Sequence, residues 1–406
     1  MTTETAARPA ERAPTRMGGA TLVTLALLAS VAPFATDLYL PAFPDMVVRL
    51  DTTNAGIQLS LTAFLIGAGL GQVVFGPISD RVGRRGPLLV GVVLYVLASV
   101  AAALAPSVAF LVAARLVQGI TGAAGMVIGR AMISDVERGQ NAARAMSMMM
   151  LVGGVAPVIA PVVGSALAEP IGWRGLLFIV AGLGAVALAC SLLFLRETKP
   201  RRIATDDDGA ARPSSTLRVL ANRTYIANTL AFAFGFATLM AYISASPFVY
   251  QEMMGLSTLQ YGLMFALNSL ALVGMTAVNA RLTRTVPVRR LAGIGLAANA
   301  GGIVVIVALT ASGAPTMWLA APFLVTVGSL GLVMGNLSAM ALDVVRPAAG
   351  SGSALLGLLQ FGLAGLVAPL VSLGGEGTAL PLAITMLVAT VVANVAFRFG
   401  RPAAAR

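Results

Sequence analysis

Long apolar stretches alternate with short polar segments along most of the chain. Twelve of these stretches hold about 20 residues or more, enough for a helix to cross the roughly 30 Å hydrocarbon core of a bilayer. They cover residues 19–41, 56–78, 86–105, 108–133, 143–167, 173–195, 224–250, 258–280, 290–311, 315–341, 351–374 and 379–398. The pattern therefore predicts an all-α membrane protein with twelve transmembrane helices.

The longest polar segment, residues 196–223, divides the apolar stretches six and six. The two halves echo each other weakly, because basic residues at similar spacing follow the second and the eighth stretch. Two six-helix bundles related by a pseudo-two-fold axis are typical of a transporter whose substrate site lies between the bundles. The alternative for the polar segment is a solvated tether without a site of its own.

Charged residues are few, and their positions predict the orientation in the membrane. Only 11% of the chain is charged, against about a quarter in soluble domains. If the N-terminus is cytoplasmic, 24 of the 27 Lys and Arg residues lie in cytoplasmic segments, with Arg49 and Arg174 outside and Arg115 within a helix. This bias indicates a multi-pass protein of the cell membrane with both termini in the cytoplasm. It explains the net charge of +11 without a nucleic-acid partner.

These observations together predict the domain organisation. We expect a cytoplasmic tail over residues 1–17, an N-terminal six-helix bundle over 18–195, a central cytoplasmic loop over 196–223, a C-terminal six-helix bundle over 224–398 and a cytoplasmic tail over 399–406.

The composition argues against catalysis. Histidine is absent, which excludes His-based triads and His metal sites. The single cysteine, Cys190, cannot form an internal disulfide. The sequence contains no phosphate-binding loop of the P-loop form. We therefore expect no enzymatic activity, no metal and no cofactor, although a non-transporting receptor remains an alternative to a transporter.

Two charged residues lie deep inside predicted spans, away from their ends: Asp37 in the first and Arg115 in the fourth. Intramembrane charges are costly unless they have a function or a partner. Both lie roughly 6–10 Å from the outer end of their helices at 1.5 Å per residue, so we expect them to pair across a shared cavity and to carry proton coupling. The alternatives are a locally hydrated Asp37 at the outer rim and an Arg115 that extends toward water.

Two motifs connect the chain to a known family. Gly76-Pro-Ile-Ser-Asp80-Arg81-Val-Gly83-Arg84-Arg85 matches the loop signature G-x-x-x-D-R-x-G-R-K/R of the major facilitator superfamily, and Leu111-Val-Ala-Ala-Arg115-Leu-Val-Gln118-Gly119 matches its fourth-span signature. The chain resembles this superfamily over all twelve spans. The resemblance implies a two-bundle transporter that works by alternating access.

Three further segments resemble one branch of that superfamily. Gly153-Gly154-Val-Ala-Pro157-Val-Ile-Ala-Pro161-Val-Val-Gly164 is similar to the antiporter signature of span 5, although Pro161 stands near a place where Gly is common. Ala35-Thr-Asp37-Leu-Tyr39-Leu-Pro41-Ala-Phe-Pro44 and Ala241-Tyr-Ile-Ser-Ala-Ser-Pro247-Phe look like the Bcr/CflA type of drug:proton antiporters. The resemblance implies proton-coupled efflux of drugs, with an exporter or importer of a specific metabolite as the nearest alternative.

The polar residues of the loop after span 2 suit a cytoplasmic latch whose charge contacts break and reform during transport. The candidates there and at the inner end of span 4 are Gly76, Asp80, Arg81, Gly83, Arg84, Arg130 and Asp135. The alternative is a loop that only determines topology.

In span 5, Gly153, Pro157 and Pro161 recur every four residues and share one helix face. Small residues allow close packing and prolines bend a helix, so this helix, with Gly154 and Gly164, is expected to seal the path against proton leak. Plain packing is the alternative.

Aromatic and amide side chains are the candidates for the substrate site, although aromatics in membrane proteins often face lipid instead. We expect the lining to include Phe34, Tyr39, Phe232, Phe236, Tyr242, Tyr261, Phe265, Phe361, Asn336 and Gln360. Such a lining suits a small amphiphilic, drug-like substrate beside protons, carried by a monomer in the lipid bilayer.

Overall fold

The computed structural model describes residues 17–137, 139–199, 220–345, 349–372 and 378–400, and within these ranges every regular element is a helix. The all-α prediction is therefore confirmed. The predicted tails, apart from residues 17, 399 and 400, and most of the predicted central loop lie outside the described residues.

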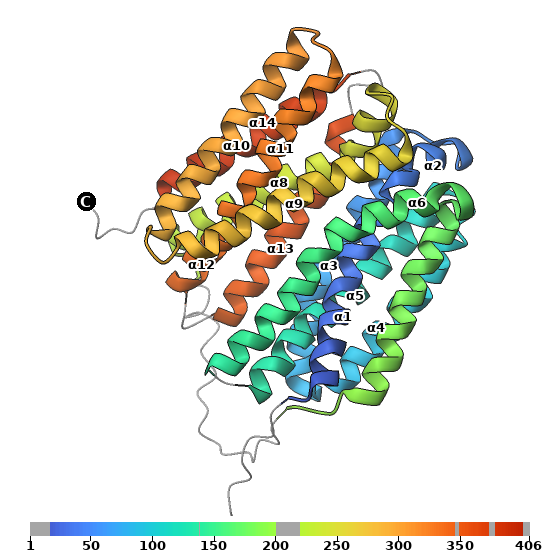
Figure 1. Cartoon of the computed structure of the whole chain (residues 1–406). Helices are drawn as coiled ribbons and strands as arrows, with labels where there is room; N and C mark the ends of the chain where they lie inside the picture. Colours follow the sequence, from blue (N-terminus) through green and yellow to red (C-terminus); the bar gives the residue numbers. More distant parts are fainter. Residues whose placement is uncertain (1–16, 138, 200–219, 346–348, 373–377, 401–406) are drawn as a thin grey trace, which may run out of the picture.

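The helices follow one another in two groups, which Figure 1 shows in blue to green and in yellow to red. The N-terminal half contains α1 (Gly19–Asp37), η1 (Leu40–Ala42), α2 (Phe43–Arg49), α3 (Asn54–Val82), α4 (Arg85–Ala103), α5 (Val108–Val136) and α6 (Gly139–Phe194). The C-terminal half contains α8 (Arg223–Pro247), η2 (Phe248–Met253), α9 (Thr258–Leu282), α10 (Val288–Ala311), η3 (Thr316–Leu319), α11 (Ala320–Ser329), η4 (Leu330–Leu332), α12 (Met334–Val344), α13 (Ala349–Val367), η6 (Ala368–Ser372) and α14 (Leu380–Phe399).

Eleven helical segments of the described chain are long and apolar enough to cross a membrane, and one of them is long enough for two crossings. The segment Gly154–Phe194 has 41 residues, or roughly 60 Å at 1.5 Å per residue, which is two crossings of the hydrocarbon core. It turns at Gly172, whose φ of 66° is accessible mainly to glycine. The described part of the chain therefore contains twelve segments that can cross a membrane, as predicted.

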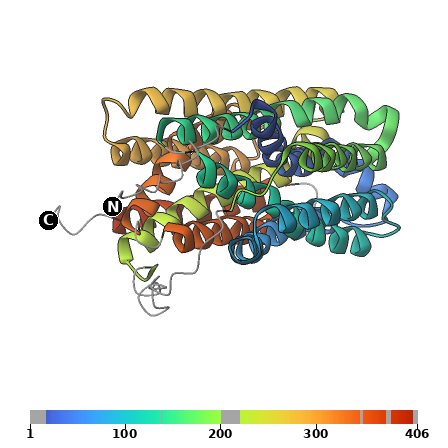
Figure 2. The ribbon, with the colours of Figure 1, turned by 90° about the horizontal axis from the view of Figure 1, so that it is seen from below.

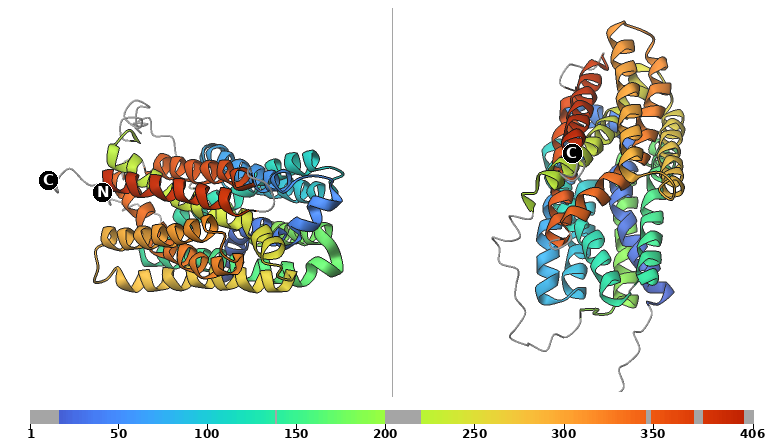
Figure 3. Two further views of the ribbon diagram at one scale, coloured as in Figure 1. Left: turned by 90° about the horizontal axis from the view of Figure 1, so that it is seen from above. Right: turned by 90° about the vertical axis from the view of Figure 1, so that its left-hand side faces the viewer.

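The helices of both halves run side by side, as the turned views in Figures 2 and 3 show. We call the end with the start of α1, the α3–α4 turn and the end of α14 the termini end, and the opposite end, which carries η1, α2 and η2, the far end. Across the halves, α3 packs on α13 and α6 packs on α9.

Glycine allows α3 and α5 to touch at backbone distance. A Cβ atom on Gly119 would lie 2.1 Å from the Phe64 carbonyl oxygen, and one on Gly71 would lie 2.1 Å from the Ile120 carbonyl oxygen. Small residues at such crossings let membrane helices pack closely. The contact holds the two helices that carry Phe64 and Arg115.

Gly119→Ala is expected to lower the melting temperature of the detergent-purified protein, because the clash is with backbone and overpacking costs about 1–3 kcal/mol. Gly182→Ala is the matched control, since a Cβ atom there meets nothing within 4 Å. Thermal unfolding of both variants tests this, and equal melting temperatures would show that the α3–α5 contact is not tight.

Candidate functional site

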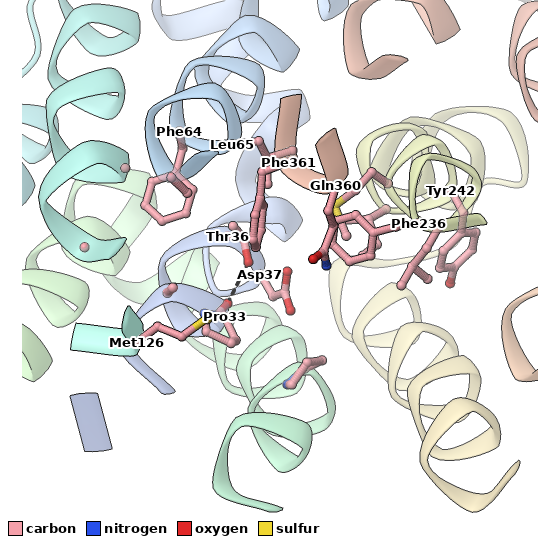
Figure 4. Close-up of a pocket in the computed structure, with 18 of the residues that line it drawn as sticks. Pro33, Thr36, Asp37, Phe64, Leu65, Met126, Phe236, Tyr242, Gln360 and Phe361 are labelled. Carbon is pink, nitrogen blue, oxygen red and sulfur yellow. Dashed lines mark hydrogen bonds between the residues drawn. The ribbon is translucent and has the colours of Figure 1, made fainter. Parts of the chain in front are cut away.

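A cavity of about 250 Å³ lies between the two halves. Residues of α1, α3, α5, α6, α8, α9, α11 and α13 line it, and most are apolar or aromatic. Its polar side chains are Thr36, Asp37, Gln72, Tyr242, Ser269 and Gln360. Figure 4 shows Asp37, Gln360 and Phe361 turned toward one shared space. The volume is slightly below the roughly 300–1,000 Å³ of common ligand pockets, so the site fits a small molecule.

Asp37 is the one charged residue among the described residues that line this cavity. It is the last residue of α1 and is 3% exposed. The helix ends here because Pro41 lacks the N–H that would bond the Asp37 carbonyl. On the other side of this turn, a Cβ atom on Gly164 of α6 would lie 2.0 Å from the Leu38 carbonyl oxygen. The span-5 glycine therefore lets α6 press directly against the segment that positions Asp37.

Arg115 is fully buried in the N-terminal half, outside the cavity lining. Its Nη1 donates to Gln118 Oε1 at 2.5 Å, and its Nη2 donates to the Tyr39 hydroxyl at 3.3 Å. The guanidinium also lies over the rings of Tyr39 and Phe64, at 4.6 and 4.5 Å from their centroids. Each of these partners of the guanidinium is an uncharged side chain.

The expected ion pair between Asp37 and Arg115 is therefore wrong for this conformation: the salt bridges of the described residues do not include it. Both residues are buried as predicted, but the guanidinium of Arg115 contacts the hydroxyl and ring of Tyr39. Its hydroxyl also contacts Ser60 Oγ at 3.0 Å. Tyr39 thus belongs to the Arg115 network and does not line the cavity.

Five of the other predicted lining residues do line the cavity: Phe236, Tyr242, Phe265, Gln360 and Phe361. The Phe236 ring of α8 and the Phe361 ring of α13, both in the C-terminal half, meet edge to face at 5.6 Å.

Four predicted lining residues lie elsewhere. Asn336 is paired with Asn279 of α9, donating to its Oδ1 at 2.7 Å and accepting from its Nδ2 at 3.2 Å. Tyr261 lies with its hydroxyl 3.3 Å from Ser246 Oγ. Phe34 and Phe232 pack in the hydrophobic core outside the lining. Their side chains satisfy contacts between helices, which sequence periodicity does not reveal.

Gln72 and Ser269 also line the cavity and were not predicted from the sequence. Gln72 lies on α3, where Gly357 of α13 leaves room for it: a Cβ atom on that glycine would lie 2.1 Å from Gln72 Oε1. A polar amide in an apolar stretch was the available signal. Ser269 Oγ donates to the Pro157 carbonyl at 3.1 Å. That carbonyl lacks its helical donor because residue 161 is also proline.

The span-5 residues therefore have separate positions. Pro157 lines the cavity, Pro161 is buried against Gly262 of α9, and Gly164 lies against Leu38 in the turn after α1. A Cβ atom on Gly154 would meet open space. Gly153 lies in α6, and its role as part of a seal stays a prediction, as does that of the others.

Contacts between the halves close the far end. Gln58 Nε2 donates to the Ser244 carbonyl at 3.1 Å, and Gln251 Nε2 donates to the Pro41 carbonyl at 3.1 Å. The Phe43 ring of α2 and the Phe248 ring of η2 also meet across the halves, with centroids 6.0 Å apart. The cavity is thus separated from the far end by a layer of side chains from both halves.

At the termini end, Arg84 joins three helices of the N-terminal half. Its side chain bonds Asp80 and Ser79 of α3, and its Nε donates to Asp135 of α5 at 2.9 Å. Burial alone would lower the pKa of Arg84, but its bonds to Asp135 and Asp80 raise that pKa above its ordinary value. The cluster also includes Glu197, which follows α6 and was not predicted.

The remaining latch candidates take different parts in this region. Gly83 adopts a φ of 106°, which favours glycine. The Arg81 carbonyl accepts from Lys199 Nζ at 2.8 Å, and a Cβ atom on Gly76 would lie 3.8 Å from the Val127 side chain, an ordinary contact distance. Arg130 is exposed and forms none of the cluster's ion pairs, so its latch role stays a prediction. A latch role for the others stays a proposal.

Glu197 caps the start of α4, whose own N-cap residue supplies no side-chain bond. Its carboxylate accepts from the N–H groups of Arg84 at 2.8 Å and Arg85 at 3.0 Å, and also from those of Thr198 and Lys199. Burial would raise the pKa of Glu197, but these four donors outweigh it and lower that pKa.

Glu197→Gln is expected to lower the melting temperature modestly at neutral pH. A lowered pKa means that the stabilisation is complete above the ordinary pKa of glutamate and is lost as the pH falls through the lowered value. The difference from wild type should therefore shrink on acidification below pH ~4. Glu169→Gln, at an exposed far-end glutamate, is the control. A difference that stays constant with pH would contradict this cap.

Known proteins resemble this chain over most of its length. Residues 25–369 match the Major Facilitator Superfamily. The chain is 33% identical over 377 residues to the MFS-type transporter YdgK of Bacillus subtilis, covering 92% of this chain and 93% of that protein. It is 28% identical over 382 residues to a bicyclomycin resistance protein homolog of Haemophilus influenzae, covering 93% and 95%.

The fold is also similar to that of solved transporters. A bacterial homolog of the human lysosomal transporter Spinster, in an inward-facing and occupied conformation, matches with a TM-score of 0.73 over 93% of this chain and 95% of that chain. The two sequences are 19% identical, so this likeness concerns the fold.

Proposed function

The chain belongs to the Major Facilitator Superfamily, and from this premise we propose that it is a proton-coupled exporter of small amphiphilic, drug-like compounds. One observation carries the proposal: among the described residues, the mostly apolar cavity between the two halves is lined by one carboxylate, that of Asp37. The resemblance to a bicyclomycin resistance protein homolog supports a drug as cargo.

The lining indicates the chemistry of the substrate. Aromatic and thioether side chains, among them Phe64, Met126 and Phe236, offer dispersion contacts to an apolar body. Gln72 and Gln360 offer amide groups from the two halves, α3 and α13. With a carboxylate and no basic side chain in the described lining, the cavity disfavours polyanions. A small compound with an apolar body and few hydrogen-bonding groups fits best.

In the proposed cycle, the proton and the substrate use the same cavity in turn. The structure has the far end closed by Gln58, Gln251 and the Phe43–Phe248 contact. Release on that side requires these contacts to break while the halves close at the termini end. Protonation of Asp37 in one state and its deprotonation in the other would couple the two movements.

The orientation follows from the distribution of arginine and lysine. We place both termini in the cytoplasm of a cell-membrane protein, with the termini end inside and the far end outside. The boundaries of the two bundles are proposed at residues 18–195 and 224–398, and the working unit is proposed to be the monomer.

Expression in a pump-deficient bacterial host with a panel of cytotoxic compounds tests the function. We expect the chain to raise resistance to small amphiphiles, and a proton uncoupler to remove this resistance. Phe236→Ala, in the cavity, should change which compounds are tolerated. Phe178→Ala, at a ring that is 45% exposed on α6, should behave as wild type. Increased accumulation of the compounds, or no effect on any of them, would contradict an exporter.

A further inference from the structure

A second concave surface lies far from the transport cavity, where α10 begins and α14 ends. Pro287, Arg289, Arg290, Phe397 and Arg398 line it, and it encloses about 400 Å³. The helices α10 and α14 pack on each other (Figure 1). We call this surface the arginine groove.

Arg289 forms the fixed floor of the groove. Its Nη1 donates to the Gly400 carbonyl at 2.8 Å, and its Nη2 donates to the Phe397 carbonyl at 2.7 Å. Its guanidinium also lies 4.4 Å from the Phe397 ring centroid. These bonds cap the end of α14 and hold Phe397 in place, while Arg290 and Arg398 are exposed at the rim.

The electrostatics of the groove are strongly positive. Three arginines meet there, and the first N–H groups of α10 add the positive end of a helix that has no side-chain cap. The sequence has no acidic residue from 253 to 342 or from 377 to 406, so neither helix supplies a carboxylate. An anion from outside the chain would be the complement of Arg290 and Arg398.

The groove lies at the edge of the membrane-crossing region. The span of α10 begins at Val288, and the span of α14 ends at Phe399. The arginines at these two helix ends therefore lie at the depth of lipid headgroups. Toward the bilayer centre, exposed apolar side chains continue the same surface. Ile294 follows Arg290 by one helical turn and is 50% exposed, and Val395 precedes Arg398 by three residues and is 48% exposed.

We propose that the arginine groove binds an anionic phospholipid. The phosphodiester of the headgroup contacts Arg290 and Arg398 above the fixed Arg289, and the acyl chains lie over Ile294 and Val395. Basic pockets between transmembrane helices are suited to such headgroups. A phosphate bridging the two rim arginines would tie the start of α10 to the end of α14. The site is independent of which compound the cavity carries.

The test uses the full-length protein in detergent. Its melting temperature is measured with added phosphatidylglycerol, phosphatidylcholine or inorganic phosphate, and retained lipid is detected by native mass spectrometry. We expect phosphatidylglycerol alone to raise the melting temperature by several degrees. The double variant Arg290→Gln/Arg398→Gln should lose this shift and the bound lipid, and Arg290→Lys/Arg398→Lys should keep part of both.

The matched control is Arg281→Gln/Arg284→Gln. These exposed arginines lie at the same end of the molecule but outside the groove, so the control should retain the full shift. Three results would overturn the proposal: an equal shift with phosphatidylcholine, a shift of the same size with inorganic phosphate, or an equal loss in the control variant. The first would mean unspecific lipid, the second a free-anion site, and the third a general effect of charge.

Discussion

Asp37→Asn is expected to abolish export driven by a pH gradient, down to the level of vesicles without the protein, while substrate binding partly survives. The amide keeps the shape of a protonated carboxyl group but cannot release a proton. In everted vesicles, uptake of a transported compound under an imposed pH gradient measures coupling, and equilibrium binding in detergent measures the site.

Asp45→Asn is the matched control for this change. Asp45 lies in α2, just after the turn that follows Asp37, and forms an exposed ion pair with Arg49 at 2.8 Å. Such exposed pairs contribute about 0–1 kcal/mol. The control should transport normally. Full gradient-driven uptake by Asp37→Asn would place the proton site elsewhere, and the described cavity lining offers no second carboxylate.

Arg115→Met is expected to abolish coupled export while leaving the protein folded, with a melting temperature near that of wild type. A buried charge without an ionic partner contributes little to stability, and apolar replacements of buried ions are often neutral or stabilising. Methionine keeps the packing against Phe64. The cost is the unpaired Gln118 oxygen, about 1–3 kcal/mol. A folded Arg115→Met variant that has lost coupled export would assign this guanidinium to transport.

Two measurements separate the alternatives for Arg115. Size-exclusion profiles and thermal unfolding report on folding, and vesicle uptake reports on transport. A variant that unfolds would make Arg115 a structural residue, and a variant that transports normally would remove it from the mechanism. Tyr39→Phe removes only the hydroxyl between Arg115 and Ser60, so we expect it to weaken transport less than Arg115→Met.

The positions of the spans were predictable because bilayer thickness sets their length. The predicted span 258–280 became Thr258–Leu282, and 290–311 became Val288–Ala311. Breaks inside spans were harder to predict. The tenth span passes through a 3-10 turn at Leu330–Leu332 that no proline marks, because its cause is close packing of Gly331 on α9.

The candidate site was predictable only in part, because periodicity does not determine how a helix is rotated among its neighbours. Asn336 and Gln360 look alike in the sequence, yet Asn336 pairs with Asn279 and Gln360 faces the cavity. The depths of Asp37 and Arg115 follow from their places in the spans. Tyr39 reaches the guanidinium because the chain turns at Pro41. The proline predicts a turn there, but the sequence does not specify the direction in which the chain turns.

Substrate-induced proton release tests the central claim most directly. Purified protein in weakly buffered detergent solution receives a transported compound, and a pH-sensitive dye records the protons released across a range of pH. We predict that the wild type releases protons on binding and that Asp37→Asn releases none although it still binds the compound. Equal proton release from both proteins would contradict the assignment of Asp37 as the coupling residue.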